Sequence, residues 1–260
     1  RPRRAAKIAR FIDHVLALFP FEPPLFNAYG IDCDFVGHPV VSEPVATEAE
    51  ALAFRDTQKI GTAPMLLALP GSRRGEVERL GKVFGQAIAP LLALHPDLRV
   101  VVPAAAPVLE DVKKAVATWP VNALILDPTE SDISASNQRK RAAFRAADIA
   151  LAASGTVSLE LAAAGTPMVI AYRMHWLSYQ IIRRMALVDT VTLVNLVSNT
   201  RAVPEFLGPA CEPERIGQAL ISVMAEPDAQ RAAMQLTMER LGQGGDAPAL
   251  RAARAVLARR

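Results

Sequence analysis

Short runs rich in valine, isoleucine and leucine recur along the chain and constrain its fold more than any other feature. They occupy residues 14–19, 35–37, 65–69, 98–102, 123–126, 149–153 and 168–172. Strands that are apolar on both sides suit a parallel sheet covered on both faces. Segments with helical patterns separate the runs, at 76–94, 108–119 and 137–147. From about residue 60 this alternation predicts a doubly wound α/β domain.

The last third of the chain has a different pattern. After Asn195 the sequence predicts helices only, at 204–207, 213–225, 229–241 and 247–260. A glycine-rich stretch at 242–246 separates the final helix from the rest. A linker-like run of proline and small residues at 37–44 marks a second boundary. We therefore expect three parts, residues 1–40, 41–242 and 243–260. Because the chain opens at Arg1 in the middle of a helical pattern, we also expect the natural protein to extend upstream.

Composition excludes several classes of protein. Of the 260 residues 51% are hydrophobic and 21% charged, which is typical of a globular chain. A net charge of +3 is too small to indicate nucleic-acid binding. Cys33 and Cys211, the two cysteines, form neither a disulfide framework nor a zinc site, and they favour a cytoplasmic location. No apolar run reaches the roughly 18 residues that a membrane span requires.

Basic residues cluster near both ends of the sequence. Lys7 and Arg10 lie in the first cluster and Arg251 and Arg254 in the second. Such clusters are either solvated helix faces or surfaces attracted to an anionic membrane. The segment 175–187 leaves a similar choice open, between an amphipathic core helix and contact with lipid.

The first candidate site is the sequence Leu-Pro-Gly-Ser-Arg-Arg-Gly-Glu at 69–76, which follows a predicted strand and precedes a helix. In open α/β sheets ligands bind at the carboxyl ends of strands. Gly71 and Gly75 allow a turn and close backbone approach. Arg73 and Arg74 carry guanidinium groups suited to phosphate oxygens. The alternative is an ordinary turn with solvated arginines.

The second candidate site is the sequence Ala-Ser-Gly-Thr-Val-Ser-Leu-Glu at 153–160, again between a strand and a helix. Gly155 permits close approach, and Ser154 or Thr156 can cap the helix. The free amides at a helix start suit a diphosphate. Glu160 lies one turn into the helix, where its carboxylate can accept hydrogen bonds from two ribose hydroxyls. The alternative for Glu160 is a carboxylate favourably placed near a helix start.

Polar residues also follow the next predicted strand. Tyr172 and Arg173 stand at its carboxyl end, and Asn195 follows the next helical segment. We expect all three to face the same crevice. Each has a structural alternative, as an edge of the core, a surface charge and a turn residue respectively.

A metal site is not predicted. Asp32 and Asp34 form the Asp-x-Asp pattern that binds a metal–nucleotide in other transferases, but they lie far in sequence from both loops. The four histidines show no ligand spacing. They are His14, His38, His95 and His175.

Taken together, these motifs resemble the lipid-A-disaccharide synthase family of GT-B glycosyltransferases, over residues 5 to 225. The matching blocks are Leu18-Phe-Pro-Phe-Glu22, Phe35-Val-Gly-His38, Leu69-Pro-Gly-Ser-Arg73 with Glu76, Ala152-Ala-Ser-Gly-Thr156 with Leu159-Glu160, Pro167-Met-Val with Tyr172-Arg173, Asn195-Leu196, and Pro204-Glu205.

The resemblance implies an inverting hexosyltransferase without metal or organic cofactor. UDP-2,3-diacylglucosamine would donate its sugar to 2,3-diacylglucosamine 1-phosphate and release UDP. Arg73 and Asn195 would be the catalytic residues, with Arg73 on the diphosphate. The substrate-binding residues would be Gly71, Ser72, Glu76, Ser154, Gly155, Thr156, Glu160, Tyr172 and Arg173.

The resemblance also assigns the three parts of the chain. Residues 1–40 would be a remnant of the acceptor-side domain, 41–242 the Rossmann-like nucleotide-sugar-binding domain, and 243–260 a helix packing on the missing domain. The general base that inversion requires would lie in that missing domain. The implied partners are the two lipid substrates and, peripherally, the inner face of the inner membrane. A homodimer is left open.

The alternatives to this function are another UDP-N-acetylglucosamine-using GT-B enzyme, namely a 2-epimerase or the peptidoglycan precursor transferase, and a non-catalytic nucleotide-binding module.

Overall fold

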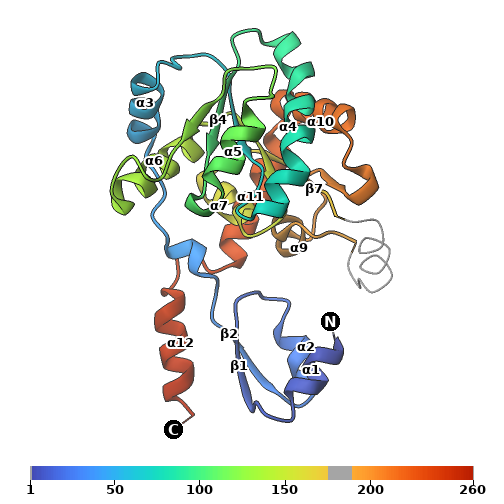
Figure 1. Cartoon of the computed structure of the whole chain (residues 1–260). Coiled ribbons are helices and arrows are strands. Elements are labelled where there is room, and N and C mark those ends of the chain that lie inside the picture. Colours follow the sequence, from blue (N-terminus) through green and yellow to red (C-terminus); the bar gives the residue numbers. More distant parts are fainter. Residues whose placement is uncertain (1, 175–188, 260) are drawn as a thin grey trace.

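A computed structural model describes residues 2–174 and 189–259. It contains a large α/β part, a small unit of two strands and two helices, and a last helix that runs beside the small unit (Figure 1). His175, Arg183, Arg184 and the rest of the predicted segment at 175–187 lie outside the described residues. No helix in the described residues is both long and apolar enough to span a bilayer.

The large part is built on one six-stranded parallel sheet. Its strand order is β5-β4-β3-β6-β7-β8, so the chain moves outward from β3 in one direction and then in the other. That reversal between β3 and β6 is the topological switch point at which ligands bind in such folds. The strands are β3 (Met65–Leu69), β4 (Arg99–Pro103), β5 (Leu124–Leu126), β6 (Ile149–Ala153), β7 (Met168–Tyr172) and β8 (Glu205–Leu207).

Helices cover both faces of this sheet. Leu66 and Ala68 of β3 belong to one apolar cluster, and Met65, Leu67 and Leu69 to a second. The first cluster is completed by α4 (Arg74–Leu94), α5 (Leu109–Val116) and α10 (Pro213–Ala225). The second is completed by α3 (Glu48–Thr57), α6 (Ile133–Ala146), α7 (Val157–Ala164), α9 (Leu193–Ser198) and α11 (Asp228–Arg240). The predicted doubly wound architecture is therefore confirmed.

One predicted helix is wrong. Residues 204–207 were expected to be helical, but Glu205–Leu207 forms β8 and pairs in parallel with β7, Ala171 opposite Phe206. Three residues are too few to show a period, and the free edge of β7 supplies a hydrogen-bonding partner that the local sequence cannot reveal. The sheet therefore extends beyond the predicted strands.

The small unit is tied to the last helix, α12 (Pro248–Leu257). Its strands β1 (His14–Ala17) and β2 (Asp32–Phe35) pair in parallel, beside α1 (Pro2–Ile8) and α2 (Pro23–Asn27). The Arg251 guanidinium donates to the Phe35 carbonyl at 2.7 Å and stacks over the Phe35 ring. Arg259, just beyond α12, donates to the carboxylates of Asp32 and Asp34 at 2.7 and 3.4 Å. The hydrogen bond from Arg259 lowers the pKa of Asp32. The Asp-x-Asp pair thus binds an arginine of this chain.

Candidate functional site

The two predicted loops open onto one cavity. β3 and β6 are neighbours in the sheet, so the loops that leave their carboxyl ends emerge side by side. The cavity has a volume of about 580 Å³. It is lined by Leu69, Gly71, Ser72, Arg73 and Glu76 from the first loop, Ala153, Ser154, Gly155, Thr156, Val157 and Glu160 from the second, and Pro103, Ala104, Ala105, Leu126, Pro128, Ser136, Asn137, Arg139, Lys140 and Phe144 from neighbouring elements. We refer to it as the loop cavity.

Glu76 organises the first loop. Its side chain is buried in the first turn of α4, and one carboxylate oxygen accepts hydrogen bonds from the backbone amides of Ser72 and Arg73 at 3.1 and 3.3 Å. The other oxygen receives the Arg73 guanidinium at 3.1 Å. Gly71 has a φ of +132°, and a Cβ there would lie 2.4 Å from the Glu76 Cβ. Gly75 lies within α4, so only Gly71 provides the turn.

This arrangement changes the expected role of Glu76. Its carboxylate faces the loop backbone, and its hydrogen bonds hold Arg73 in place at the cavity wall. The Arg73 side chain is 82% exposed, so its remaining N–H donors are open to a ligand. Arg74 points elsewhere and pairs with Glu78 at 3.0 Å.

The second loop leads into the amino end of α7. Gly155 has open space where a Cβ would project. The predicted side-chain cap by Ser154 or Thr156 is wrong, because Thr156 is the N-cap with a helical φ of −66° and makes no side-chain cap. Ser158 instead donates back to the Gly155 carbonyl at 2.9 Å. The Ser158 and Leu159 amides donate to the Gly155 and Thr156 carbonyls at 3.4 and 2.9 Å. Gly155, Thr156 and Val157 line the loop cavity at the start of α7, where the backbone amides of a helix end can meet an anion.

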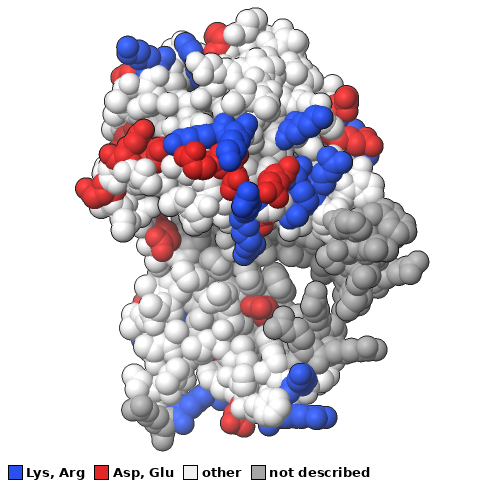
Figure 2. Space-filling model, in the orientation of Figure 1, with Lys and Arg blue, Asp and Glu red and all other residues white. Residues whose placement is uncertain are grey.

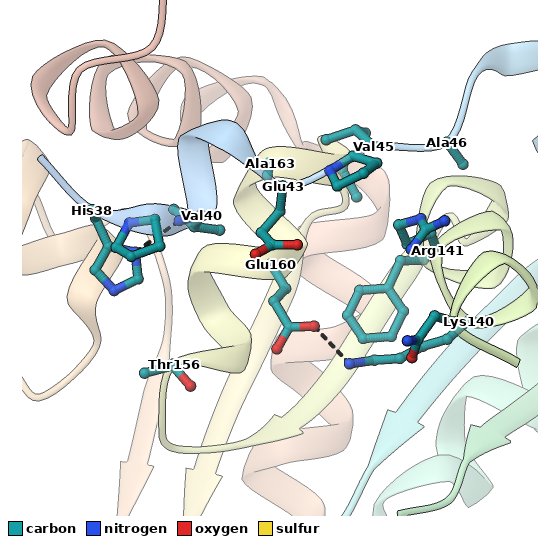
Figure 3. Close-up of a pocket in the computed structure, with 15 residues that line it drawn as sticks. His38, Val40, Glu43, Val45, Ala46, Lys140, Arg141, Thr156, Glu160 and Ala163 are labelled. Atoms are coloured by element: carbon teal, nitrogen blue, oxygen red, sulfur yellow. Dashed lines mark hydrogen bonds and ion pairs between the residues drawn. The ribbon is translucent and has the colours of Figure 1, made fainter. Parts of the chain in front are cut away.

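Glu160 forms an ion pair with Lys140, a residue that was not predicted from the sequence. Lys140 of α6 donates to the Glu160 carboxylate at 2.6 Å. Both residues also line a second cavity of about 420 Å³, which runs between α6 and α7 beneath residues 38–46 (Figure 3). We refer to this as the linker cavity. The Lys140–Glu160 pair therefore lies where the two cavities adjoin.

The far wall of the loop cavity is apolar. Pro103 ends β4 and is followed by Ala104 and Ala105, while Leu126 ends β5 and Pro128 lies just beyond it. Arg139 closes this wall by donating to the Asp127 carbonyl at 2.5 Å and to Glu130 at 3.0 Å. These residues were not predicted from the sequence because the strand-end rule was applied only where glycine or polar residues follow a strand. Applying the rule to every predicted strand would have identified this wall.

The third predicted group does not join the loop cavity. Tyr172 is half-buried at the end of β7 and Arg173 is exposed, with its carbonyl accepting from Arg79 at 3.1 Å. Neither lines the cavity. Asn195 is 1% exposed within α9, where it donates to the Val203 carbonyl at 2.9 Å and accepts from the Val203 amide at 3.0 Å.

Asn195 belongs to a buried network around Glu205. The Glu205 carboxylate accepts hydrogen bonds from the Thr190 hydroxyl, the Val191 and Thr192 amides, and Asn195. Burial raises the pKa of Glu205, but these hydrogen bonds outweigh burial and hold its pKa below the ordinary value. The amide of Asn195 is thus used to join α9 to the start of β8, rather than facing the crevice as expected.

The charges around the loop cavity suit an anion. Three cations, Arg73, Arg139 and Lys140, face two carboxylates, Glu76 and Glu160. Figure 2 shows basic side chains gathered in a band across the large part, with acidic side chains between them. With the amide donors of α7, this cavity can hold a diphosphate beside an apolar slot.

Comparison with known proteins gives a consistent family match. A family model described as lipid-A-disaccharide synthetase matches residues 1–257. The lipid-A-disaccharide synthase of Ruegeria pomeroyi is 62% identical over 259 residues, covering 100% of this chain and 65% of the relative. That of Rhodospirillum centenum is 46% identical, covering 99% of this chain and 63% of the relative. The chain therefore spans slightly less than two thirds of the length of these relatives.

Solved structures share the fold at low identity. The UDP-GlcNAc 2-epimerase of Neisseria meningitidis bound to UDP-GlcNAc superposes with a TM-score of 0.62 at 15% identity, covering 95% of this chain and 62% of that one. An Anabaena protein in complex with UDP and glucose superposes with a TM-score of 0.53 at 14% identity, covering 98% and 66% respectively. At these identities the likeness establishes the architecture alone.

Proposed function

Because this chain belongs to the lipid-A-disaccharide synthetase family, we propose that it is the nucleotide-sugar-binding half of an inverting hexosyltransferase. The complete enzyme transfers 2,3-diacylglucosamine from its UDP derivative to 2,3-diacylglucosamine 1-phosphate and releases UDP. Family membership favours this reaction over the 2-epimerase, the peptidoglycan precursor transferase and the non-catalytic module.

The meeting of the two loops at one cavity is the observation that carries this proposal. Arg73 offers guanidinium donors on one side, and the amino end of α7 offers backbone amides on the other. A diphosphate between them gains negative charge as the glycosidic bond breaks, so donors fixed in advance stabilise it most as it departs. Structural relatives with bound UDP or UDP-GlcNAc have the same architecture.

The remaining groups extend this assignment. Gly71, Ser72, Ser154, Gly155 and Thr156 hold phosphate oxygens through their backbone or hydroxyl groups. Glu160 accepts the ribose hydroxyls, and the apolar wall after β4 and β5 takes the uracil. Glu76 acts through Arg73 as a positioning residue. Tyr172 and Arg173 remain candidates for the sugar, and Asn195 supports the segment that leads into β8.

Among the described residues that line the loop cavity, none is an evident general base. Inverting transfer requires a group that accepts the acceptor's proton. The two carboxylates that line the loop cavity, Glu76 and Glu160, already bind the loop amides and Lys140. We propose that the base belongs to the third of the family's sequence that this chain does not match, and that the chain binds UDP-sugars without turning them over.

Calorimetric titration of the 260-residue chain with UDP tests the site. Binding at micromolar UDP is expected. Arg73→Ala removes charge-assisted contacts of about 1.5–3 kcal/mol, which weakens binding roughly 10- to 150-fold. Arg74→Ala is the matched control, because Arg74 pairs with Glu78 outside the loop cavity. Equal affinities for Arg73→Ala and the unaltered chain would remove Arg73 from the site.

We also propose peripheral attachment to the cytoplasmic face of the inner membrane. Apolar side chains stand exposed on the small unit and α12, among them Phe11, Leu25 and Leu257. Flotation with anionic vesicles at low salt checks this, and an unbound chain would exclude it. A homodimer is a separate proposal, checked by sedimentation of the chain over a range of concentrations.

A further inference from the structure

One ion pair joins the two helices that border both cavities. Lys140 comes from α6 and Glu160 from α7, and the ammonium lies 2.6 Å from one carboxylate oxygen. In Figure 3 the second oxygen of Glu160 points away from Lys140. Among the described residues it has no hydrogen-bond partner, since the contact with Lys140 is the one that Glu160 makes.

Stability of the fold does not account for this pair. The two side chains are 41% and 43% exposed, and ion pairs exposed to this degree contribute little because water and salt screen them. The packing of α6 against α7 rests instead on buried apolar residues, among them Phe144 and Leu161. The pair is therefore free to serve a ligand.

Lys140 is held in one direction by a second contact. Its ammonium lies 5.1 Å from the centre of the Phe144 ring, and Phe144 is buried. A cation above an aromatic face is attracted by the ring electrons. An ammonium has three N–H donors, of which Glu160 uses one. The other two N–H donors of Lys140 remain available at the border of the two cavities, next to the Glu160 oxygen that has no partner among the described residues.

A vicinal diol matches this arrangement of groups. Each hydroxyl can donate one hydrogen bond and accept others. A carboxylate accepts from the diol, and an ammonium beside it donates to a diol oxygen. Hydroxyl recognition by such a pair discriminates strongly against a ligand that lacks the hydroxyl, because the charged groups then lose a partner.

We propose that Lys140 determines ribose specificity: it orients Glu160 and donates a hydrogen bond to the ribose diol of the nucleotide. This inference rests on the proposed nucleotide-sugar function and adds a residue to it. Without Lys140, Glu160 can turn into the linker cavity, and the ligand's 2′-hydroxyl loses both partners.

Calorimetry with UDP and 2′-deoxy-UDP measures this specificity directly. For the unaltered chain we expect UDP to bind about 10- to 100-fold more tightly than the deoxy form. In Lys140→Met the preference falls below about 3-fold, while Lys140→Arg retains most of it. Lys82→Met removes the same charge from α4, outside both cavities, and leaves the preference unchanged.

The ratio of the two affinities separates specificity from general electrostatics. Loss of any nearby positive charge weakens the binding of UDP and of 2′-deoxy-UDP alike, so the ratio of their affinities stays constant. A Lys140→Met variant that kept the full preference would overturn the inference. Tight UDP binding by the unaltered chain without preference for ribose would also overturn it, while leaving the proposed function intact. If the unaltered chain bound neither nucleotide, the proposed function would fail as well.

Discussion

Replacing Gly71 by alanine tests how the first loop is built. Gly71 has a φ of +132°, a region that residues with a Cβ rarely occupy. The new methyl carbon would lie 2.4 Å from the Cβ of Glu76 and 2.6 Å from its Oε2. Because the Glu76 Cβ is fixed by the first turn of α4, the loop has to move and its amides leave the carboxylate.

The expected cost follows from these two effects. Backbone strain contributes about 1–3 kcal/mol. Loss of the hydrogen bonds from the Ser72 and Arg73 amides to a buried carboxylate contributes about 1.5–3 kcal/mol more. Together they lower the free energy of unfolding by about 2.5–6 kcal/mol, which lowers Tm by roughly 5–20 °C for a chain of this size. UDP affinity also falls, because Arg73 leaves the cavity wall.

Gly61→Ala is the control for strain alone. Gly61 has a φ of +58°, and a Cβ there would meet nothing within 4 Å. We expect a loss of about 1 kcal/mol and unchanged UDP binding. Thermal unfolding followed by circular dichroism and UDP calorimetry would be run on both variants. Equal losses of stability in the two, with UDP binding retained in both, would refute the role assigned to Glu76.

Two further predictions concern other parts of the fold. The lowered pKa of Glu205 supplies stability that is present above its ordinary value of 4.5 and is lost as pH falls through the folded-state pKa. Glu205→Gln should therefore be less stable than the unaltered chain at pH 7. Below about pH 4.5 its urea unfolding midpoint should depend less on pH, and an equal pH dependence in the two proteins would contradict this. Arg251→Ala removes the contacts of α12 with Phe35. Limited proteolysis should then cut faster near Gly242, and an unchanged cutting rate would count against α12 being held there.

The sequence predicted what depends on local pattern. The buried strands of the large part were predictable because parallel strands covered on both faces are apolar at nearly every position. Both loops were predictable because a glycine lies two residues after each of these strands, Gly71 after β3 and Gly155 after β6. Even the role of Glu76 has a local signal, since a glutamate at the third position of a helix is typical of a capping box.

Long-range pairing decided the rest. β8 exists because β7 has a free edge, and nothing within three residues encodes that neighbour. Asn195 was expected at the crevice from its place after a helix, but Glu205 and Val203 draw its amide inward. Lys140 escaped notice because its partner Glu160 lies twenty residues away on another helix.

The contact between α12 and β2 has a consequence for how the protein is made. Arg251 and Phe35 are 216 residues apart in sequence, and Arg259 and Asp32 are 227 apart. On a ribosome, which releases the chain from its amino end, β2 emerges long before the two arginines that contact it. The contacts between β2 and α12 can therefore form only after the whole parallel sheet has been synthesised, and nascent chains stalled before residue 251 should lack them.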